Sequence, residues 1–372
     1  CIRDRNKARV IAFYLPQYHP IPENDKYWGK GFTEWTNVAK AKPLFRGHYQ
    51  PHIPADLGFY DLRLPEVREA QAELARDAGI EGFCYYHYWF GNGKMLLQKP
   101  FEEVLRLGKP DFPFCLCWAN HDWTTKTWVK GSSMVNNTMI AQQEYLGEQD
   151  DIKHFEYCLR AFKDHRYITI EGKPIFLIYD PLSFPNVKEF MNRWNFLAKK
   201  NNLKGIYFIG VTTGRQSSYK IVTNLGFDGV CHNRRWEAEA KAAGFRFVRR
   251  MQSLLGWHLG ISLMKYDYNK VVRNYDTPEN KLENCYPVIT PGFDRTPRAG
   301  RRAGIYVNSS PKNFKKHVAE VCKSIQDKDD DHRLVFLSAW NEWGEGNYME
   351  PDLKWGHGYL EALKSVVKFQ IK

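Results

Sequence analysis

Short runs of apolar residues alternate with longer amphipathic stretches along most of the chain. The apolar runs predict strands at residues 9–16, 82–90, 112–118, 174–179, 205–211, 226–231, 287–290 and 334–337. The amphipathic stretches predict helices at residues 64–77, 100–108, 148–164, 186–200, 217–224, 313–326 and 358–369. Strands and helices therefore alternate, as they do when parallel strands are joined by crossover helices.

This alternation predicts an α/β fold, and eight strand–helix units in 372 residues favour a (β/α)8 TIM barrel with long βα loops. We expect a single catalytic domain over residues 1–372, with an irregular insertion at about 234–284, where the sequence has no clear period. A doubly wound parallel sheet is the structural alternative. The sequence contains neither a Gly-rich dinucleotide fingerprint after the first strand nor a phosphate-binding Gly-Lys-Ser/Thr loop.

In a barrel of this kind the active site lies at the C-terminal ends of the strands. Those ends, together with the long aromatic loop after the first strand, supply the candidate substrate-binding residues. They are Tyr14, Glu34, Trp35, His87, Tyr88, Trp118, Asn120, Asp122, Tyr179, Asp294, Trp340, Asn341 and Trp343. Each alone has an ordinary explanation, since a polar side chain at a strand end often satisfies a neighbouring carbonyl group. Their convergence on one rim favours a ligand site.

The stretch that follows the eighth strand carries the clearest chemistry. Glu342 and Glu345 lie in the sequence Trp-Asn-Glu-Trp-Gly-Glu-Gly, at residues 340–346. A paired carboxylic acid and carboxylate beside an apolar platform suits chemistry at a sugar. The structural alternative is that the glutamates are surface charges and that the tryptophans belong to the core. We predict that Glu342 and Glu345 are catalytic.

Composition adds a high aromatic content, with 12 Trp, 21 Tyr and 23 Phe making up 15% of the chain. Aromatic faces stack on sugars and on nucleobases, and cores also use them. The net charge of +12 suggests a nucleic acid or an anionic glycan as partner, but the basic residues are spread along the chain. Local clusters occur at Arg246, Arg249 and Arg250 and at Arg298, Arg301 and Arg302, without a nucleic-acid motif. We interpret them as a solvated basic face and expect no nucleic-acid partner.

The metal-ligating residue types form no recognisable metal motif. Of the eight cysteines, Cys84, Cys115, Cys117 and Cys231 lie in apolar runs, so we expect mostly reduced, buried thiols. The potential ligands His87, His121, Asp122 and His232 have neither His-x-x-x-His nor Cys-x-x-Cys spacing. We expect no metal and no cofactor. The acidic run at Asp327 and 329–331 is interpreted as solvated loop charge.

Few features bear on location. The sequence contains no signal peptide and no apolar run long enough to span a membrane. Cys1 is compatible with a processed lipoprotein terminus. The compartment and the oligomeric state stay open.

Five motifs spread over nearly the whole chain resemble those of WbsX-type proteins, which in turn resemble glycoside hydrolase family 99. They are FYLPQYHPIPEND, GKGFTEWTNV, YYHYWF followed by Gly93-Lys94, LCWANHDWT, and AWNEWGEGNYMEPD. The last motif and the Phe-Thr-Glu-Trp pattern are the most specific. The usual third-strand motif is not followed at His121-Asp122 and Thr125-Lys126. The family's detailed substrate contacts therefore do not carry over to these positions.

The resemblance implies a barrel enzyme of the family 99 type, whose members are retaining endo-acting α-mannosidases without a carboxylate nucleophile. In that mechanism one glutamate removes the proton from the sugar 2-hydroxyl, whose oxygen displaces the leaving group to give a 1,2-anhydro sugar. A second glutamate protonates the leaving oxygen. Carried onto the Asn-Glu-Trp-x-Glu motif, these roles make Glu342 the base and Glu345 the acid/base.

We therefore expect a retaining glycoside hydrolase that cleaves α-mannoside- or α-rhamnoside-type linkages of an oligosaccharide or polysaccharide, because the 2-oxygen must be trans to the leaving group. The alternative is a glycosyltransferase in cell-surface polysaccharide biosynthesis. Such an enzyme would require a diphosphate site, on a metal held by Asp-x-Asp or on a basic clamp, and no convincing Asp-x-Asp lies at a strand end. A carbohydrate-binding protein is the third possibility, although both glutamates are intact.

Overall fold

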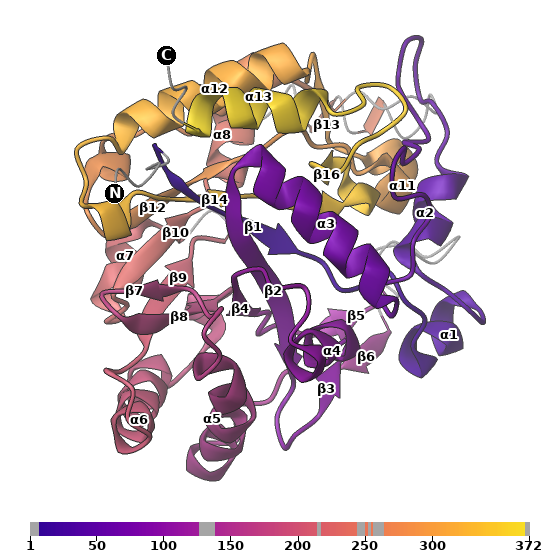
Figure 1. Ribbon diagram of the computed structural model, residues 1–372. Coiled ribbons are helices and arrows are strands. Elements are labelled where there is room, and N and C mark those ends of the chain that lie inside the picture. The colour runs from indigo at the N-terminus through magenta and orange to yellow at the C-terminus, as the bar shows by residue number, and fades with distance from the viewer. Residues whose placement is uncertain are drawn as a thin grey trace.

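The computed structural model describes residues 7–125, 138–213, 217–243, 250–251, 254–255 and 264–368 (Figure 1). Cys1, Lys126, Arg246 and Arg249, the end of the helix predicted to reach residue 369, and part of the segment 234–284 lie outside the described residues.

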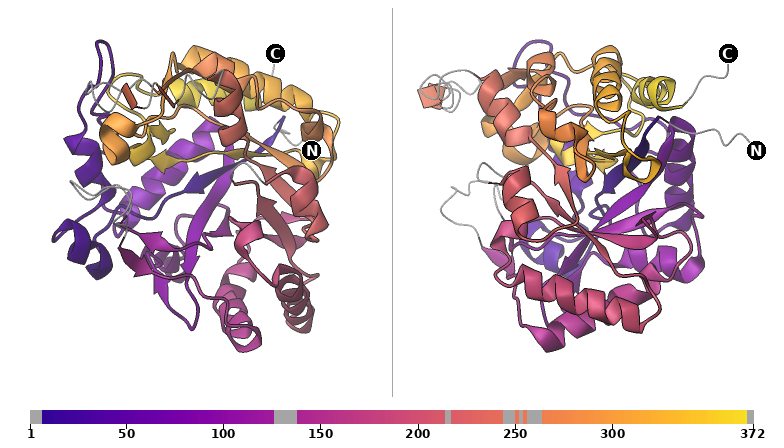
Figure 2. Two further views of the ribbon diagram at one scale, coloured as in Figure 1. Left: turned by 180° about the vertical axis from the view of Figure 1, so that it is seen from behind. Right: turned by 90° about the vertical axis from the view of Figure 1, so that its left-hand side faces the viewer.

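Parallel strands form a closed barrel at the centre of the molecule (Figures 1 and 2). They are β1 (Arg9–Tyr14), β2 (Ile80–Trp89), β4 (Phe114–Trp118), β8 (Lys173–Ile178), β9 (Tyr207–Val211), β10 (Gly229–His232), β12 (Cys285–Ile289) and β14 (Leu334–Leu337). Each strand pairs in parallel with the next, and β14 pairs with β1, which closes the ring. Every residue of β4, β9 and β12 is buried, which explains their continuous apolar runs. The predicted (β/α)8 TIM barrel is confirmed.

Helices cover the outside of this ring (Figure 2). They are α3 (Pro65–Ala78), α4 (Lys99–Leu107), α5 (Glu148–Phe162), α6 (Val187–Lys200), α7 (Tyr219–Asn224), α12 (Pro311–Ser324) and α13 (Gly358–Val367). In α3, Pro65 occupies the first turn, where its fixed φ is favourable, and Gly79 ends the helix with a φ of 88°. All seven predicted helices are present, and those of their predicted ends that lie within the described residues differ by no more than two residues.

The connections carry further short elements. The helices are α1 (Pro22–Trp28), α2 (Glu34–Lys40), α8 (Arg235–Ala242), α10 (Tyr268–Val272) and α11 (Thr296–Ala299). The strands are β3 (Met95–Leu96), β5 (Trp123–Thr124), β6 (Met139–Ala141), β7 (Thr169–Ile170), β11 (Lys265–Asp267), β13 (Ile305–Val307), β15 (Asn341–Glu342) and β16 (Asn347–Tyr348). Single 3₁₀ turns are η2 (Pro181–Ser183), η3 (Pro278–Lys281), η4 (Gly300–Arg302), η5 (Asp330–His332) and η6 (Trp343–Glu345).

The described part of the segment 234–284 is more regular than the sequence predicted. Strand β11 pairs in parallel with β13 outside the barrel. Tyr268 of α10 is buried, and its hydroxyl donates a hydrogen bond to the carbonyl oxygen of Thr290 at 2.6 Å, just beyond β12. This part of the segment is therefore attached to the barrel wall.

The cysteines match their expected state. Cys84, Cys115, Cys117, Cys158, Cys231, Cys285 and Cys322 are buried and free. Burial raises the pKa of the Cys84 thiol well above its ordinary value, which keeps it protonated and inert. Among the described residues, no helix has the length and apolar character needed to cross a membrane.

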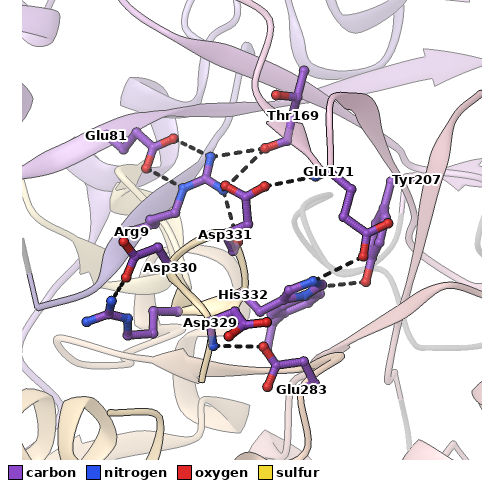
Figure 3. A network of polar contacts seen from close by, with 12 residues as sticks. Arg9, Glu81, Thr169, Glu171, Tyr207, Glu283, Asp329, Asp330, Asp331 and His332 are labelled. Atoms are coloured by element: carbon purple, nitrogen blue, oxygen red, sulfur yellow. Dashed lines mark hydrogen bonds and ion pairs between the residues drawn. The ribbon is translucent and has the colours of Figure 1, made fainter. Parts of the chain in front are cut away.

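A polar network closes the barrel at the N-terminal ends of the strands (Figure 3). Arg9 at the start of β1 donates to both carboxylate oxygens of Glu81, at 2.9 and 2.7 Å. It also donates to the carbonyl oxygens of Thr169 and Asp331, at 3.2 and 3.0 Å. The predicted solvated acidic run is half-exposed here, but it is not free: Asp331 accepts a bond from the backbone of Glu171 at 3.0 Å.

Candidate active site

The two predicted catalytic glutamates lie on a tight hairpin beyond β14. Strands β15 and β16 pair antiparallel, and Gly346 completes the turn with a φ of 54°. The side chain of Asn341 fixes this hairpin to the end of β1, because it accepts from Leu15 N at 2.8 Å and donates to Leu15 O at 3.0 Å. Behind the hairpin the ring of Trp343 stacks on Tyr348, with 3.7 Å between the centroids. The loop is thereby held rigidly.

Glu342 and Glu345 both line a cavity of about 330 Å³ beyond the C-terminal ends of the strands. Its size lies within the range of ligand pockets, about 300–1,000 Å³. The predicted residues Tyr88, Asp122 and Tyr179 also line it. Asp122 is oriented by the backbone of Gln143, from which its Oδ1 accepts at 2.8 Å. Five predicted residues thus meet at one cavity.

Arg298 connects the two glutamates beneath the cavity. Its Nη1 lies 3.1 Å from Glu342 Oε1 and 2.9 Å from Glu345 Oε1. Its Nε and Nη2 both donate to Glu34, whose carboxylate is completely buried. Asn37 donates to the other oxygen of Glu34 at 2.9 Å. Glu34 is therefore a support for the arginine rather than a lining residue.

The interpretation of Arg298 as part of a solvated basic face is wrong. Arg298 is buried, whereas Arg301 and Arg302 are exposed as expected. The short helix α11 causes the difference, because it presents Arg298 to α2 and η6 while the chain beyond it runs along the surface. A single basic cluster in the sequence thus contains one residue of the site and two ordinary surface charges.

The two glutamates have opposite electrostatic environments. Burial and repulsion from Glu345 raise the pKa of Glu342, and Arg298 opposes them only in part. Burial alone would raise the pKa of Glu345 too, but Arg298, Arg295 and Arg235 hold it well below its usual range. Arg295 Nε lies 3.3 Å and Arg235 Nη1 3.8 Å from this carboxylate. The pair therefore keeps its proton on Glu342 and its negative charge on Glu345.

Several predicted residues lie behind the cavity, where they hold its wall. Tyr14 donates to Gln71 at 2.7 Å, Trp35 donates to Tyr60 O at 2.8 Å, and Trp343 donates to Glu350 at 2.6 Å. The remaining members of this supporting set are Glu34, Asn341, Trp340, Asn120 and Trp118, all buried and absent from the lining that the described residues form.

His87 faces the helical layer instead of the cavity. Alternate residues of a strand point to opposite faces, so Tyr86 and Tyr88 line the cavity while His87 points toward α5. There its Nε2 lies 2.8 Å from His154 Nε2, and burial lowers the pKa of His87 to about 3. His87, His154 and Cys158 could offer a metal three ligand atoms within 4.8 Å of one another. The short contact between the ring nitrogens fits a hydrogen bond between neutral imidazoles.

Asp294 lines a second cavity. Its Oδ2 accepts from His48 Nε2 and from Gln50 Nε2, each at 2.7 Å, and its Oδ1 accepts from Thr296 N at 2.9 Å. The prediction that Asp294 contacts a substrate beside the two glutamates therefore has no support from its position.

Tyr86, Arg235 and Arg298 are among the lining residues that were not predicted from the sequence. The strand period would have found Tyr86, since it shares a face with Tyr88. No local sequence pattern marks Arg235 as a site residue. In the structure its guanidinium group lies over the rings of Trp236 and Phe293, at 4.7 and 4.4 Å from their centroids. These contacts exist only in the folded chain.

Comparison with known proteins gives a family and a fold. The family model described as "Glycosyltransferase WbsX" matches residues 10–363. Two curated relatives, each called "Uncharacterized protein WxcX" and from two strains of Xanthomonas campestris pv. campestris, are 34% identical over 361 residues. The match covers 97% of this chain and 50% of each relative, so the chain spans about half the length of the curated relatives it matches.

Solved structures share the fold at low sequence identity. A "Glycoside hydrolase-like protein" is 15% identical, with a TM-score of 0.60 over 99% of this chain and 96% of its own. The GH99 endo-alpha-mannosidase from Bacteroides thetaiotaomicron, in complex with BIS-TRIS-Propane, is 15% identical, with a TM-score of 0.56 over 96% and 95%. The family match covers nearly the whole chain, and the chain belongs to the WbsX family.

Proposed function

We propose that this chain is a retaining glycoside hydrolase that cleaves α-mannoside- or α-rhamnoside-type linkages in a polysaccharide. The observation that carries the proposal is the pair of glutamates that face one cavity, are joined by Arg298 and hold their protons unequally. Two carboxyl groups whose pKa values are pushed apart are the usual source of an acid and a base at one site. The fold shared with the GH99 endo-alpha-mannosidase agrees with the proposal.

The chemistry needs no carboxylate nucleophile. The base removes the proton from the sugar 2-hydroxyl, the 2-oxygen forms a bond to the anomeric carbon, and the bond to the leaving oxygen breaks as the acid protonates it. Water then opens the 1,2-anhydro ring, giving its proton to the carboxylate that acted as acid. The former base returns a proton to the 2-oxygen. Displacement requires the 2-oxygen and the leaving group to be trans, as in α-mannosides and α-rhamnosides.

The two roles can be assigned in two ways. The family resemblance makes Glu342 the base and Glu345 the acid/base. The arginine contacts within the site favour the opposite protonation, since Glu345 has three arginines nearby and Glu342 has one. The first assignment therefore requires that bound substrate moves the proton from Glu342 to Glu345. The second requires no such shift.

Glutamine substitutions test both the function and the roles. We expect Glu342→Gln and Glu345→Gln each to lose about 10²–10⁴-fold in kcat on an α-mannan or a rhamnose-containing polysaccharide, because each removes one proton-transfer group. On an aryl glycoside with an activated leaving group, the variant that lacks the acid should keep part of its activity. Glu361→Gln, an exposed glutamate on α13, is the control. Parent-like hydrolysis by Glu342→Gln would remove the mechanism.

A glycosyltransferase in cell-surface polysaccharide biosynthesis is the second candidate. The family description names this activity, and Arg235 and Arg295 line the cavity, where guanidinium groups could hold the diphosphate of a nucleotide sugar. Both arginines already lie near Glu345, which reduces their free charge. Incubation with a nucleotide-sugar panel and an acceptor glycan, with products identified by mass, separates transfer from hydrolysis.

A further inference from the structure

A second cavity, of about 380 Å³, opens beside the catalytic one. Its wall comes from the loops after β1, β12 and β14 and from β13, so it lies at the same end of the barrel. Phe293 lines both cavities. Asp294, which lines the second cavity, donates its backbone N–H to the carbonyl oxygen of Glu345 at 2.6 Å. The two cavities are neighbours separated by one thin wall.

Aromatic rings form much of the surface of this second cavity. The rings of Tyr49 and His52 stack, with centroids 4.7 Å apart and an interplanar angle of 18°. Trp355 is 36% exposed, unusually open for its size. Lys354 Nζ lies 4.9 Å from the centroids of both Tyr49 and Trp355. Tyr49 is already contacted by His52 and Lys354, whereas the exposed surface of Trp355 can stack on the C–H face of a pyranose ring.

Two buried carboxylates supply the polar part of the lining. Asp294 and Asp352 are only 6% and 4% exposed. Asp294 is held by His48 and Gln50, and Asp352 accepts from Tyr348 OH at 2.6 Å and from Trp355 N at 2.6 Å. Burying a carboxylate is costly unless donors satisfy it, and these donors also fix its direction. Each carboxylate can accept about four hydrogen bonds, which leaves acceptor capacity for a ligand hydroxyl.

We propose that the second cavity binds uncharged sugar units of the same polysaccharide, remote from the bond at Glu342 and Glu345. The two fixed carboxylates accept from sugar hydroxyls. Among the described residues that line this cavity they outnumber its one lysine, Lys354, which disfavours an acidic sugar. The shared wall at Phe293 allows one glycan chain to reach both cavities. The identity of the glycan rests on the proposed function, whereas the lining of the second cavity is independent of the catalytic pair.

Binding to inactive protein tests the proposal directly. In a Glu342→Gln/Glu345→Gln background, titration calorimetry with α-mannan and with a rhamnose-rich polysaccharide should detect binding. Adding Trp355→Ala should weaken that binding about tenfold, as the loss of one aromatic stacking contact implies. Phe196→Ala, which removes a 68% exposed ring on α6, should leave it unchanged. Equal affinity with and without Trp355, or no binding of either polysaccharide, overturns the proposal.

Kinetics of the active enzyme separate this proposal from the proposed function. Only the longer substrate reaches the second cavity. Trp355→Ala alone should therefore lower kcat/KM on the polysaccharide about tenfold relative to kcat/KM on an aryl glycoside. The change should arise mainly from KM of the polysaccharide. An equal fall on both substrates contradicts a remote sugar site. Absence of hydrolysis by the parent would count against the proposed function alone, since the binding titration still decides the second cavity.

Discussion

At the residue scale, Arg298 sets the charge of the whole site. Removing one partner of a buried ion pair costs about 3–5 kcal/mol, because the other charge is left without compensation. Here one guanidinium compensates Glu34 and also contacts Glu342 and Glu345. It stabilises the negative charge on Glu345, while the pKa of Glu342, which has weaker compensation, stays raised. Arg298 contacts both glutamates, whereas Arg295 and Arg235 lie near Glu345 alone, and this difference makes the pair unequal.

Glu350 is a further buried carboxyl group, directly behind the hairpin that carries Glu342 and Glu345. Its Oε2 accepts from Trp343 Nε1 at 2.6 Å and from Tyr60 OH at 2.9 Å, and its Oε1 accepts from Gln71 Nε2 at 2.6 Å. Burial nevertheless raises the pKa of Glu350 to about 7. The ordering of the loop that carries Glu342 and Glu345 is therefore coupled to a group whose pKa is raised to about 7.

This coupling predicts a pH-dependent stability. Because the pKa of Glu350 rises from 4.5 to about 7 on folding, the folded state binds more protons than the unfolded state between these values. The contribution of Glu350 to the free energy of unfolding is fully present below pH 4.5 and is lost as the pH rises through 7. The loss amounts to about 3 kcal/mol. Glu350→Gln should remove this part of the pH dependence, measured by urea unfolding from pH 4.5 to 7.5. Identical pH slopes in parent and variant would contradict the assignment.

At the scale of elements, the site depends on how closely α2 approaches η6. The side chains of Glu34 and Arg298 lie directly against Gly344, which has no side chain of its own. A Cβ at this position would overlap Glu34 Oε2 and lie 2.9 Å from Arg298 Nε. The absence of a side chain at residue 344 therefore allows the helix, the arginine and the catalytic turn to meet.

Gly344→Ala should displace the Glu34–Arg298 pair and, through it, the carboxylates of Glu342 and Glu345 that we propose are catalytic. We expect a loss of about 10²-fold in kcat/KM, the size associated with a displacement of about 1 Å at a catalytic group. Gly304→Ala is a matched control, because its Cβ would have its nearest contact at 3.5 Å, with Tyr266. Initial rates on the polysaccharide, with thermal unfolding as a check on folding, measure both. Parent-like rates for Gly344→Ala would show that the tight approach is not required.

The elements also explain which parts of the fold and of the site could be predicted from the sequence. Apolar runs and amphipathic periods located the barrel strands and helices, because both patterns are local. The same logic found Tyr88 and Tyr179 at strand ends but selected His87, whose side chain lies on the other face of β2. The pairing of Arg298 with Glu34 joins residues 264 positions apart, so no local pattern contains it.

At the scale of the whole molecule, the two ends of the barrel differ in what they carry. The C-terminal ends of the strands carry both cavities and the glutamates. The N-terminal ends carry the network around Arg9, where β1 is tied to Glu81 on β2, to Thr169 on β7 and to the turn before β14 (Figure 3). Since this network lies where the first and last strands of the ring meet, we expect it to serve closure of the barrel and not catalysis.

Arg9→Met tests this division between the ends. The substitution keeps an unbranched apolar stem but leaves Glu81 and the carbonyl groups of Thr169 and Asp331 without their donor. Losing such half-buried bonds should cost about 1–3 kcal/mol of unfolding free energy, with kcat/KM unchanged. Arg106→Met removes the exposed Arg106–Glu103 pair of α4 and should cost less than about 0.5 kcal/mol. Urea unfolding and initial rates on the same samples give both quantities. A fall in kcat/KM for Arg9→Met under conditions where it is fully folded would mean that closure of the barrel at one end controls the site at the other.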